Sequence, residues 1–338
     1  MVLFAPDGVL VAQPIDQRGL ESEQGAPVKS VEPGWFGQPE LVHRIRRIVE
    51  KAQSKNAQRI GLSFVDLNTG NPLIKYRADD DFHPASNIKL LTSATALHVL
   101  GARHRWVTLI GTDQTRNSSM GDLFIKGGGD PSLAVGDLSE WVLQLKSMGL
   151  SRIDGDLIID ATLFDSFGLP PGFEEKDQDG AYRSAVSTIN LNWNHVVVRV
   201  SDRGKSKAHI AVFPPNDYVK IVNKTRVKPK VLRPISLQQN VLKTRQKILV
   251  KGQLKRGKSR QFRRRIGSPL RFFAAALRAQ LALNQIHFDG QVRFKSIETI
   301  PKILITHESK PLSTILKAVN SWSNNLCAEV LVLSLPHK

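Results

Sequence analysis

The sequence of 338 residues has a single cysteine, Cys327, and no long apolar run. One cysteine cannot form an intrachain disulfide, and it excludes a metal cluster held by several thiolates. No apolar stretch approaches the roughly 18 residues that a transmembrane helix requires. The N-terminal residues 1–17 have no basic residue before a short apolar stretch that Asp7 interrupts, so they do not resemble a signal peptide. The protein therefore either stays inside the cell or has an export signal that precedes this sequence.

Metal-binding patterns are also missing. The nine histidines include no His-x-x-x-His pair and no Cys/His cluster, so neither a metal site nor a cofactor is expected. The glycine-rich stretch 127–132 (GGGDPS) lacks the Gly-Lys-Ser/Thr ending of a phosphate-binding loop. We interpret it as a structural turn in which Asp130 caps its own backbone. Trp322 and Cys327 are interpreted as packing residues.

Positive charge is concentrated in one segment. The net charge is +18, but residues 203–265 hold 20 Lys/Arg and one acid, Asp217. Charged and apolar residues alternate there, which predicts strands with one buried and one cationic face. Such a face could bind nucleic acid, but the segment has few aromatic residues for stacking and no nucleic-acid-binding motif. A solvated face, or one attracted to other polyanions, is the favoured interpretation.

The remaining chain predicts a mixed α/β protein. Residues 1–38 are rich in Gly, Pro, Gln and Glu and are predicted to be a flexible leader. An amphipathic helix is expected over 39–55, followed by a two-stranded hairpin whose turn is 68–71. A helix after Pro84 should end at Gly101, with Leu90, Leu91 and Leu97 on its apolar face. Further helices are expected from Ser268-Pro269 and from Leu312 to the end of the chain.

Ser86 and Lys89 are the candidates for chemistry. A serine hydroxyl needs a base within hydrogen-bond reach to become a nucleophile. Residues three apart on a helix lie on one face, so the Lys89 amine can be that base if burial lowers its pKa. Ser86 is the only serine in the chain followed by lysine at this spacing, and it opens an apolar helix directly after a hairpin.

This context resembles a known family. The stretch GLSFVDLNTGNPLIKYRADDDFHPASNIKLLTSATALHVLG is similar to the opening of the penicillin-binding transpeptidase fold, which serine β-lactamases share. The later pieces KGGGDPSL, SRIDGDLIID, PPGF with Tyr182, and NSWSNNLCAEVL resemble one branch. That branch is the D-alanyl-D-alanine carboxypeptidase/endopeptidase family, the class C low-molecular-mass penicillin-binding proteins. The resemblance covers about residues 40–338.

The resemblance implies roles and boundaries. Ser86 would be the nucleophile, Lys89 the base and Ser323 the proton relay, while Asn325 would hold the lysine and the substrate amide. Ser54-Lys55-Asn56 also fits the Ser-x-Asn pattern but lacks the Leu-x-Ala-Glu that follows Ser323. The transpeptidase-like domain would comprise 39–104 and 305–338, split by an insertion over 105–304 that is mainly β and contains a basic β subdomain at 195–265.

The family's third motif, Lys-Thr-Gly or His-Thr-Gly, does not occur in this sequence. In the family it lies on a strand beside the nucleophile, binds the substrate carboxylate and helps to form the oxyanion hole. We therefore expect a C-terminally truncated member that lacks the last sheet strands and is impaired in catalysis.

The expected function is a serine-type D-Ala-D-Ala carboxypeptidase or endopeptidase of the periplasm or another extracytoplasmic space. Its partners would be peptidoglycan peptides, with β-lactam antibiotics as covalent inhibitors, and no nucleic acid. The alternative is a non-catalytic remnant that binds the cell wall or a polyanion.

Overall fold

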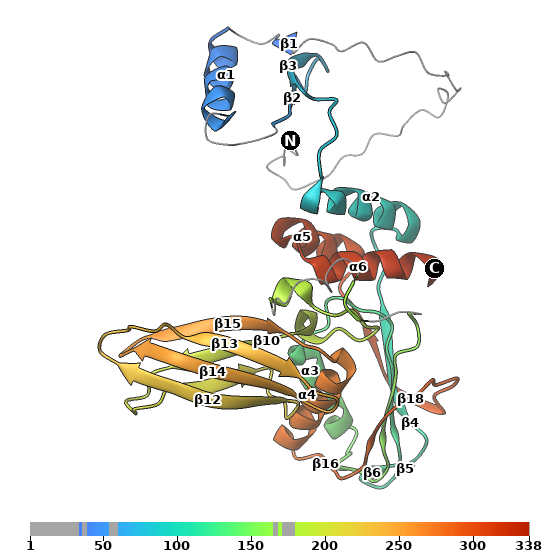
Figure 1. The fold of residues 1–338 in the computed structure, drawn as a ribbon. Coiled ribbons are helices and arrows are strands. Elements are labelled where there is room, and N and C mark those ends of the chain that lie inside the picture. Colours follow the sequence, from blue (N-terminus) through green and yellow to red (C-terminus); the bar gives the residue numbers. More distant parts are fainter. Residues whose placement is uncertain (1–33, 36–38, 54–59, 165–167, 171–179, 338) are drawn as a thin grey trace. The chain divides into compact units, whose positions relative to one another are not determined.

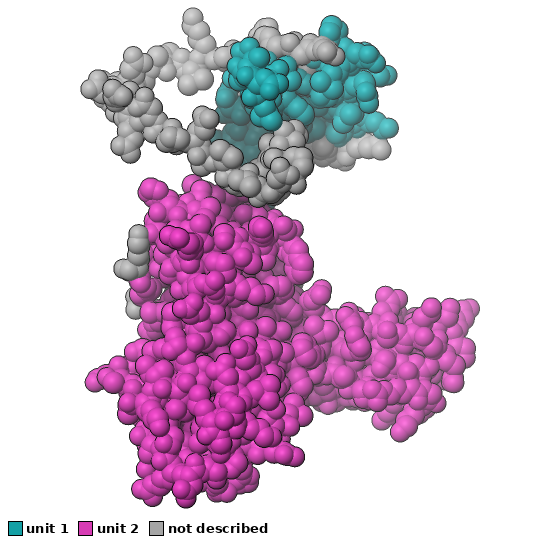
Figure 2. Space-filling view, turned by 180° about the vertical axis from the view of Figure 1, so that it is seen from behind, with its two compact units in different colours: residues 1–85 teal, residues 86–338 magenta. Residues whose placement is uncertain are grey.

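The fold is mixed α/β, as predicted. A computed structural model describes residues 34–35, 39–53, 60–164, 168–170 and 180–337. The chain forms two compact units, residues 1–85 and 86–338 (Figure 2). Within the described part, no helix combines the length and hydropathy that a membrane crossing needs.

The first unit holds one helix and one small antiparallel sheet. Helix α1 (Pro39–Gln53) precedes β2 (Leu62–Val65) and β3 (Pro72–Tyr76), which form the predicted hairpin. Its turn is fixed by the Asp66 carboxylate, which accepts the backbone N–H of Asn68 at 2.8 Å, and by Gly70 in a left-handed conformation. The sheet has a third strand, β1 (Gly34–Trp35), paired with β3.

The prediction of a two-stranded ribbon was therefore one strand short. A strand of two residues is too short to show an alternating pattern, and it falls inside the segment predicted to be a leader. The other residues of that segment lie outside the described part of the chain.

The body of the second unit is built on two sheets (Figure 1). The larger has the order β17-β9-β7-β4-β18 and the smaller the order β16-β8-β6-β5. The strands of the larger sheet are β4 (Val107–Thr112), β7 (Leu123–Lys126), β9 (Leu157–Asp160), β17 (Val292–Phe294) and β18 (Lys302–Glu308). Those of the smaller are β5 (Thr115–Arg116), β6 (Ser119–Met120), β8 (Arg152–Ile153) and β16 (His287–Phe288).

Helices α3 (Val135–Ser147) and α4 (Pro269–Leu283) complete the body of the second unit. Trp141 of α3 is buried and meets Phe273 of α4 edge to face, with ring centroids 6.3 Å apart. The glycine-rich stretch 127–132 is a structural turn, as predicted: Asp130 Oδ1 accepts the backbone N–H of Ser132 at 2.6 Å.

Six strands of the second unit form an arm that projects from the body (Figures 1 and 2). One sheet has the order β11-β10-β15 and the other β12-β14-β13, and their inward side chains share one apolar core. The strands are β10 (His195–Ser201), β11 (His209–Phe213), β12 (Val219–Lys228), β13 (Ser236–Val241), β14 (Gln246–Lys255) and β15 (Ser259–Arg265). Buried and exposed positions alternate along β12, which confirms the predicted two-faced strands.

Three helices pack together at one end of the second unit. Helix α2 (Ile88–Leu100) packs against α5 (Leu312–Trp322) and α6 (Asn325–Ser334). A cluster of buried residues joins them: Ala96, Leu312, Ile315, Leu316, Val319, Cys327, Ala328 and Leu331. Short 3₁₀ turns complete the described elements: Ala85–Asn87, Ala181–Arg183, Leu191–Asn194 and Leu335–His337.

Two sequence predictions about these helices were wrong. The helix expected from Leu312 to the end is two helices, because the chain turns left-handed at Ser323 (φ 53°). In α2 the buried face carries Lys89, Ser93 and Ala96, whereas Leu90 and Leu91 are exposed. The predicted end of α2 at Gly101 (φ 85°) is confirmed.

Gly128 provides a test of the body's packing. A Cβ atom there would lie 1.8 Å from the carbonyl oxygen of Val107 in β4, and backbone cannot move aside cheaply. We expect Gly128→Ala to destabilise the protein by about 1–3 kcal/mol or more, measured by urea unfolding. In Gly136→Ala the new methyl group meets open space, so stability should be unchanged or slightly higher. Equal unfolding midpoints for both variants would contradict this packing.

Candidate active site

Ser86 lies at the entry to helix α2. It belongs to the 3₁₀ turn Ala85–Asn87, which runs directly into α2, so it occupies the first turn of the helical segment as expected. The residue is exposed. A hydroxyl in this position is held by the rigid start of a helix and is still open to an incoming molecule.

Lys89 lies beneath Ser86 on the same face. Its side chain is buried, with 7% of the residue exposed, and its Nζ donates a hydrogen bond to Ser86 Oγ at 3.1 Å. Burial lowers the pKa of Lys89, because a charged amine loses hydration there, and the charge of Glu329 acts in the opposite direction. A lysine with a lowered pKa spends more time as the neutral amine that can accept a proton.

Ser323 approaches the same amine from a remote part of the chain. Lys89 Nζ also donates to Ser323 Oγ, at 3.4 Å, across 234 positions of sequence. The local backbone explains this placement: α5 ends at Ser323 in a left-handed conformation, and α6 starts anew with the Asn324 side chain accepting the N–H of Cys327 at 3.0 Å. The break between α5 and α6 turns the Ser323 hydroxyl toward α2.

Asn325 takes a different contact from the one that the resemblance implied. Its Nδ2 donates to the backbone carbonyl of Tyr182 at 3.0 Å, and within the described part of the chain no hydrogen bond joins it to Lys89. Tyr182 lies in the 3₁₀ turn Ala181–Arg183 and is exposed. Asn325 therefore anchors a surface turn next to the two serines. A role in holding the substrate amide stays a prediction.

Ser93 and Glu329 also support the site. Neither was given a role from sequence, although Glu329 ends the Leu-x-Ala-Glu stretch that follows Ser323. Ser93, one turn below Lys89, donates to Asn320 Oδ1 of α5 at 3.2 Å, which fixes the two helices to each other. Glu329 of α6 is half-buried. Burial raises its pKa above the ordinary value, and the opposing effect of the charge of Lys89 is smaller. The spacing of Asn325 and Glu329, four residues apart on one helix face, is the signal that could have pointed to Glu329.

The remaining candidates fall outside the site or pack as structural residues. Ser54, Lys55 and Asn56 lie outside the described residues. Cys327 is buried, and burial raises the pKa of its thiol to about 12, so it is a packing residue as predicted. Trp322 is 71% exposed and contacts only the edge of Trp193 among the described rings, so its interpretation as a packing residue was largely wrong.

The geometry brings one buried amine between two exposed hydroxyls. A neutral amine at this position can take the proton of Ser86 Oγ, and the resulting ammonium can pass a proton on through Ser323 Oγ. This is the arrangement required for nucleophilic attack by serine with proton return to a leaving group.

Comparison with known proteins gives a consistent result. A family model described as the D-Ala-D-Ala carboxypeptidase 3 (S13) family matches residues 41–338. A D-alanyl-D-alanine carboxypeptidase of Actinomadura sp. is 35% identical over 133 residues, which is 39% of this chain and 25% of that protein. The D-alanyl-D-alanine carboxypeptidase DacB of Haemophilus influenzae is 24% identical over 281 residues, which is 80% of this chain and 58% of that protein.

The fold likeness extends to solved structures. Penicillin binding protein 4 (dacB) from Haemophilus influenzae matches with a TM-score of 0.70 and 23% identity, over 85% of this chain and 65% of that one. A second structure of that protein, complexed with a β-lactam, matches with a TM-score of 0.63. The chain thus spans less than two thirds of the length of these relatives.

Glu329→Gln tests the electrostatics around Lys89. The carboxylate favours the protonated amine, so its removal should lower the pKa of Lys89 further, by a measurable fraction of a unit or more. The titration of the Lys89 Nζ can be followed by NMR. The matched control is Glu298→Gln, which replaces an exposed glutamate between β17 and β18 of the body. It should leave the titration of Lys89 unchanged. A Lys89 pKa that rises in Glu329→Gln would show that the carboxylate does not act on this amine.

Proposed function

Because the chain belongs to the D-Ala-D-Ala carboxypeptidase 3 (S13) family, we propose that it is a serine-type D-Ala-D-Ala carboxypeptidase or endopeptidase acting on peptidoglycan peptides. The observation that carries the proposal is the position of Lys89 Nζ, 3.1 Å from Ser86 Oγ and 3.4 Å from Ser323 Oγ. The reaction would proceed through an acyl-serine intermediate.

In the proposed mechanism the neutral Lys89 amine takes the proton of Ser86 as its Oγ attacks the carbonyl carbon of the scissile amide. The tetrahedral intermediate collapses when the amide C–N bond breaks. The leaving nitrogen receives a proton that travels from Lys89 through the Ser323 hydroxyl. Water then attacks the acyl-serine ester and gives up a proton to Lys89. As the bond between the acyl carbon and Ser86 Oγ breaks, Lys89 returns this proton to Oγ, and the product leaves as a carboxylic acid. Asn325 would hold the substrate amide near Ser323.

The proposal includes a domain arrangement. The transpeptidase-like domain would comprise 39–104 and 305–338, with 105–304 as an insertion that contains the basic subdomain 195–265. Helix α2 comes from the first piece and α5 and α6 from the second, and their shared buried cluster supports this pairing. The sheet that completes such a domain in the family would have more strands than the three described in the first unit.

We further propose that this sequence is a weak catalyst. It contains no Lys-Thr-Gly or His-Thr-Gly tripeptide, which in the family supplies a carboxylate-binding cation and lies on the strand of the oxyanion hole. Loss of one oxyanion-hole donor typically slows a reaction by about 100- to 1,000-fold. β-Lactams would acylate Ser86 slowly for the same reason.

Since peptidoglycan lies outside the cytoplasm, the site of action would be periplasmic or otherwise extracytoplasmic.

The alternative is a non-catalytic remnant that binds the cell wall or a polyanion. The absence of the third motif and the positive charge of the arm favour it. It differs from the first proposal in one measurable respect, because a remnant would form no covalent bond through Ser86.

Labelling with a fluorescent penicillin separates the two. We expect slow labelling of the purified chain, with mass spectrometry locating the adduct on Ser86, and no labelling of Ser86→Ala. Ser323→Ala should label at least about 100-fold more slowly than the unchanged chain, because the proton relay is lost. Ser54→Ala, in the competing Ser-x-Asn match, is the control and should label as the unchanged chain does.

A chain that forms no adduct under prolonged exposure, although folded, would contradict the enzyme and support the remnant. Labelling as fast as that of a family member that carries the third motif would contradict only the expected impairment.

A further inference from the structure

The outward face of the arm carries an unusual arrangement of charge. Strands β12 and β14 run parallel, with Lys220 opposite Lys247, Lys224 opposite Lys251 and Lys228 opposite Lys255. Because Val219, Ile248 and Val250 face the buried core and side chains alternate, these lysines all point to the outer side. We call the six lysines and Arg226, which is on the same face, the cationic ladder. All seven residues are exposed.

The cationic ladder has no counterion among the described residues. None of its members forms a salt bridge with a described acid. The one acid of the segment, Asp217, pairs with Arg278 of α4 at 3.4 Å. Like charges directly opposite each other on neighbouring strands, about 4.8 Å apart, destabilise a sheet. The ladder therefore does not serve the stability of the arm.

Its dimensions suit an extended polymer. Successive lysine pairs are four residues apart, which is about 13 Å along the strand, so the three pairs extend over about 26 Å. Six of the seven cations are lysines, which bind phosphate as point charges, without the planar fork that arginine offers to phosphates and carboxylates. A row of single charges on a flat face matches a flexible chain with one negative charge per repeat.

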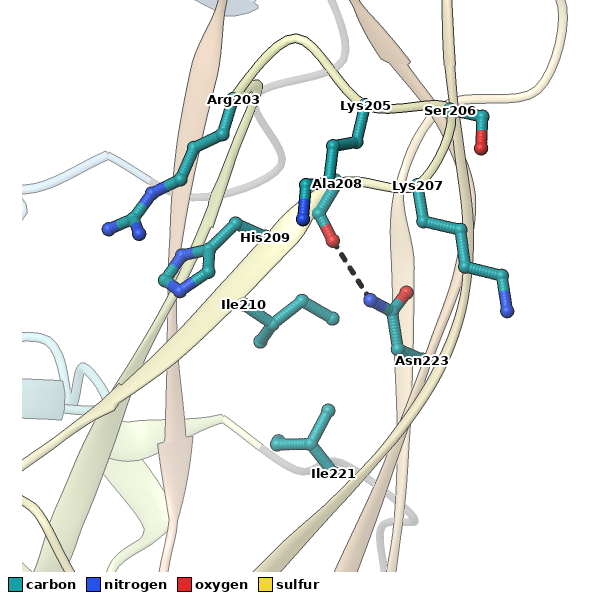
Figure 3. A pocket seen from close by; sticks show the side chains of 9 residues that line it. All are labelled: Arg203, Lys205, Ser206, Lys207, Ala208, His209, Ile210, Ile221 and Asn223. Carbon is teal, nitrogen blue, oxygen red and sulfur yellow. Dashed lines mark hydrogen bonds between the residues drawn. The ribbon is translucent and has the colours of Figure 1, made fainter.

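The edge of the same sheet extends the positive surface. A cavity of about 550 Å³ opens where β11 and β12 meet, on the inner side of β12. Figure 3 shows Arg203, Lys205 and His209 around it, with Ile210 and Ile221 nearby and Asn223 held by its bond to the carbonyl of Ala208. A bound chain that leaves the cationic ladder at β12 meets further cations at this edge.

Nucleic acid fits this face less well. Single strands bind through aromatic side chains on which bases stack, and duplexes are usually read by an element that enters a groove. The apolar neighbours of the cationic ladder on its own face are Val222 and Leu249. The aromatic residues of the segment lie elsewhere: Phe213 on β11, Phe262 on β15 and the buried Tyr218.

From this face we infer that the cationic ladder binds a polyol-phosphate polymer of the cell envelope, with the phosphodiester chain lying along β12 and β14. The attraction is electrostatic, through release of counterions from the polymer, and falls steeply with salt. The assignment of the polymer to the cell envelope rests on the extracytoplasmic site of action proposed above, whereas binding to the ladder does not depend on Ser86 and holds for an inactive chain.

The test is binding of the full chain to immobilised poly(glycerol phosphate) at about 150 mM salt, near physiological ionic strength. The triple variant Lys220→Gln/Lys224→Gln/Lys228→Gln removes one member of each pair. Its affinity should fall at least tenfold, and the slope of log affinity against log salt should fall by about two. Its unfolding midpoint in urea should stay the same or rise, since like-charge repulsion is relieved.

The matched control Lys295→Gln/Lys310→Gln/Lys317→Gln loses the same charge from exposed sites outside the arm and should bind within twofold of the unchanged chain. A second variant, Lys247→Gln/Lys251→Gln/Lys255→Gln, should lose as much affinity as the first and guards against a folding defect in either strand. Ser86→Ala should bind normally, which separates this result from that of penicillin labelling.

Three outcomes would overturn the inference. The first is no binding of the unchanged chain, and the second is an equal loss in the ladder and control variants, which would reduce the effect to net charge. The third is tighter, ladder-dependent binding to DNA or to phosphatidylglycerol vesicles at equal phosphate concentration, which would assign the face to nucleic acid or to membrane.

Discussion

The burial of one amine beneath two hydroxyls is the constraint on which the active-site region depends. An amine that loses its water binds its proton less tightly, and this would allow Lys89 to act as the base of the proposed mechanism. The same burial costs free energy unless partners compensate, and the partners come from α5 and α6. Ser323 accepts a hydrogen bond, and Glu329 provides a charge of opposite sign. Residues of all three helices of this end therefore surround the Lys89 amine, beside the apolar cluster that joins them.

The position of Ser323 has its own structural requirement. A residue other than glycine in the left-handed region costs roughly 1–2 kcal/mol, and the cost is tolerated where surrounding contacts hold the backbone. Here the compensation is local, because Asn324 caps α6, and tertiary, because Val319 and Leu331 are fully buried beside the break. The strained backbone at this point separates two helices that would otherwise continue as one.

Apart from Ser323 as a partner of Lys89, which the family resemblance implied, the features that could be predicted from sequence are the local ones. The turn closed by Asp66, the end of α2 at Gly101 and the Ser86–Lys89 pair all depend on residues within a few positions of one another. The strand β1 and the break at Ser323 could not be predicted, since neither has a compositional signal. Leu90 and Leu91 were wrongly assigned to the buried face of α2, whereas Leu97 packs against the buried cluster as predicted. The helix buries Lys89 and Ser93 against polar partners, and hydrophobic periodicity assumes that apolar side chains are the buried ones.

The arm and the helical end of the second unit would contribute to function in different ways. Binding of an envelope polymer to the cationic ladder would raise the concentration of the protein near its substrate, as a tether does. It would contribute no interaction that strengthens in the transition state, because the ladder faces outward on strands that project from the body (Figure 1). In the proposed mechanism, proton transfer at Ser86 depends on Lys89 and Ser323, whose hydrogen bonds lie in the helical end and not in the arm.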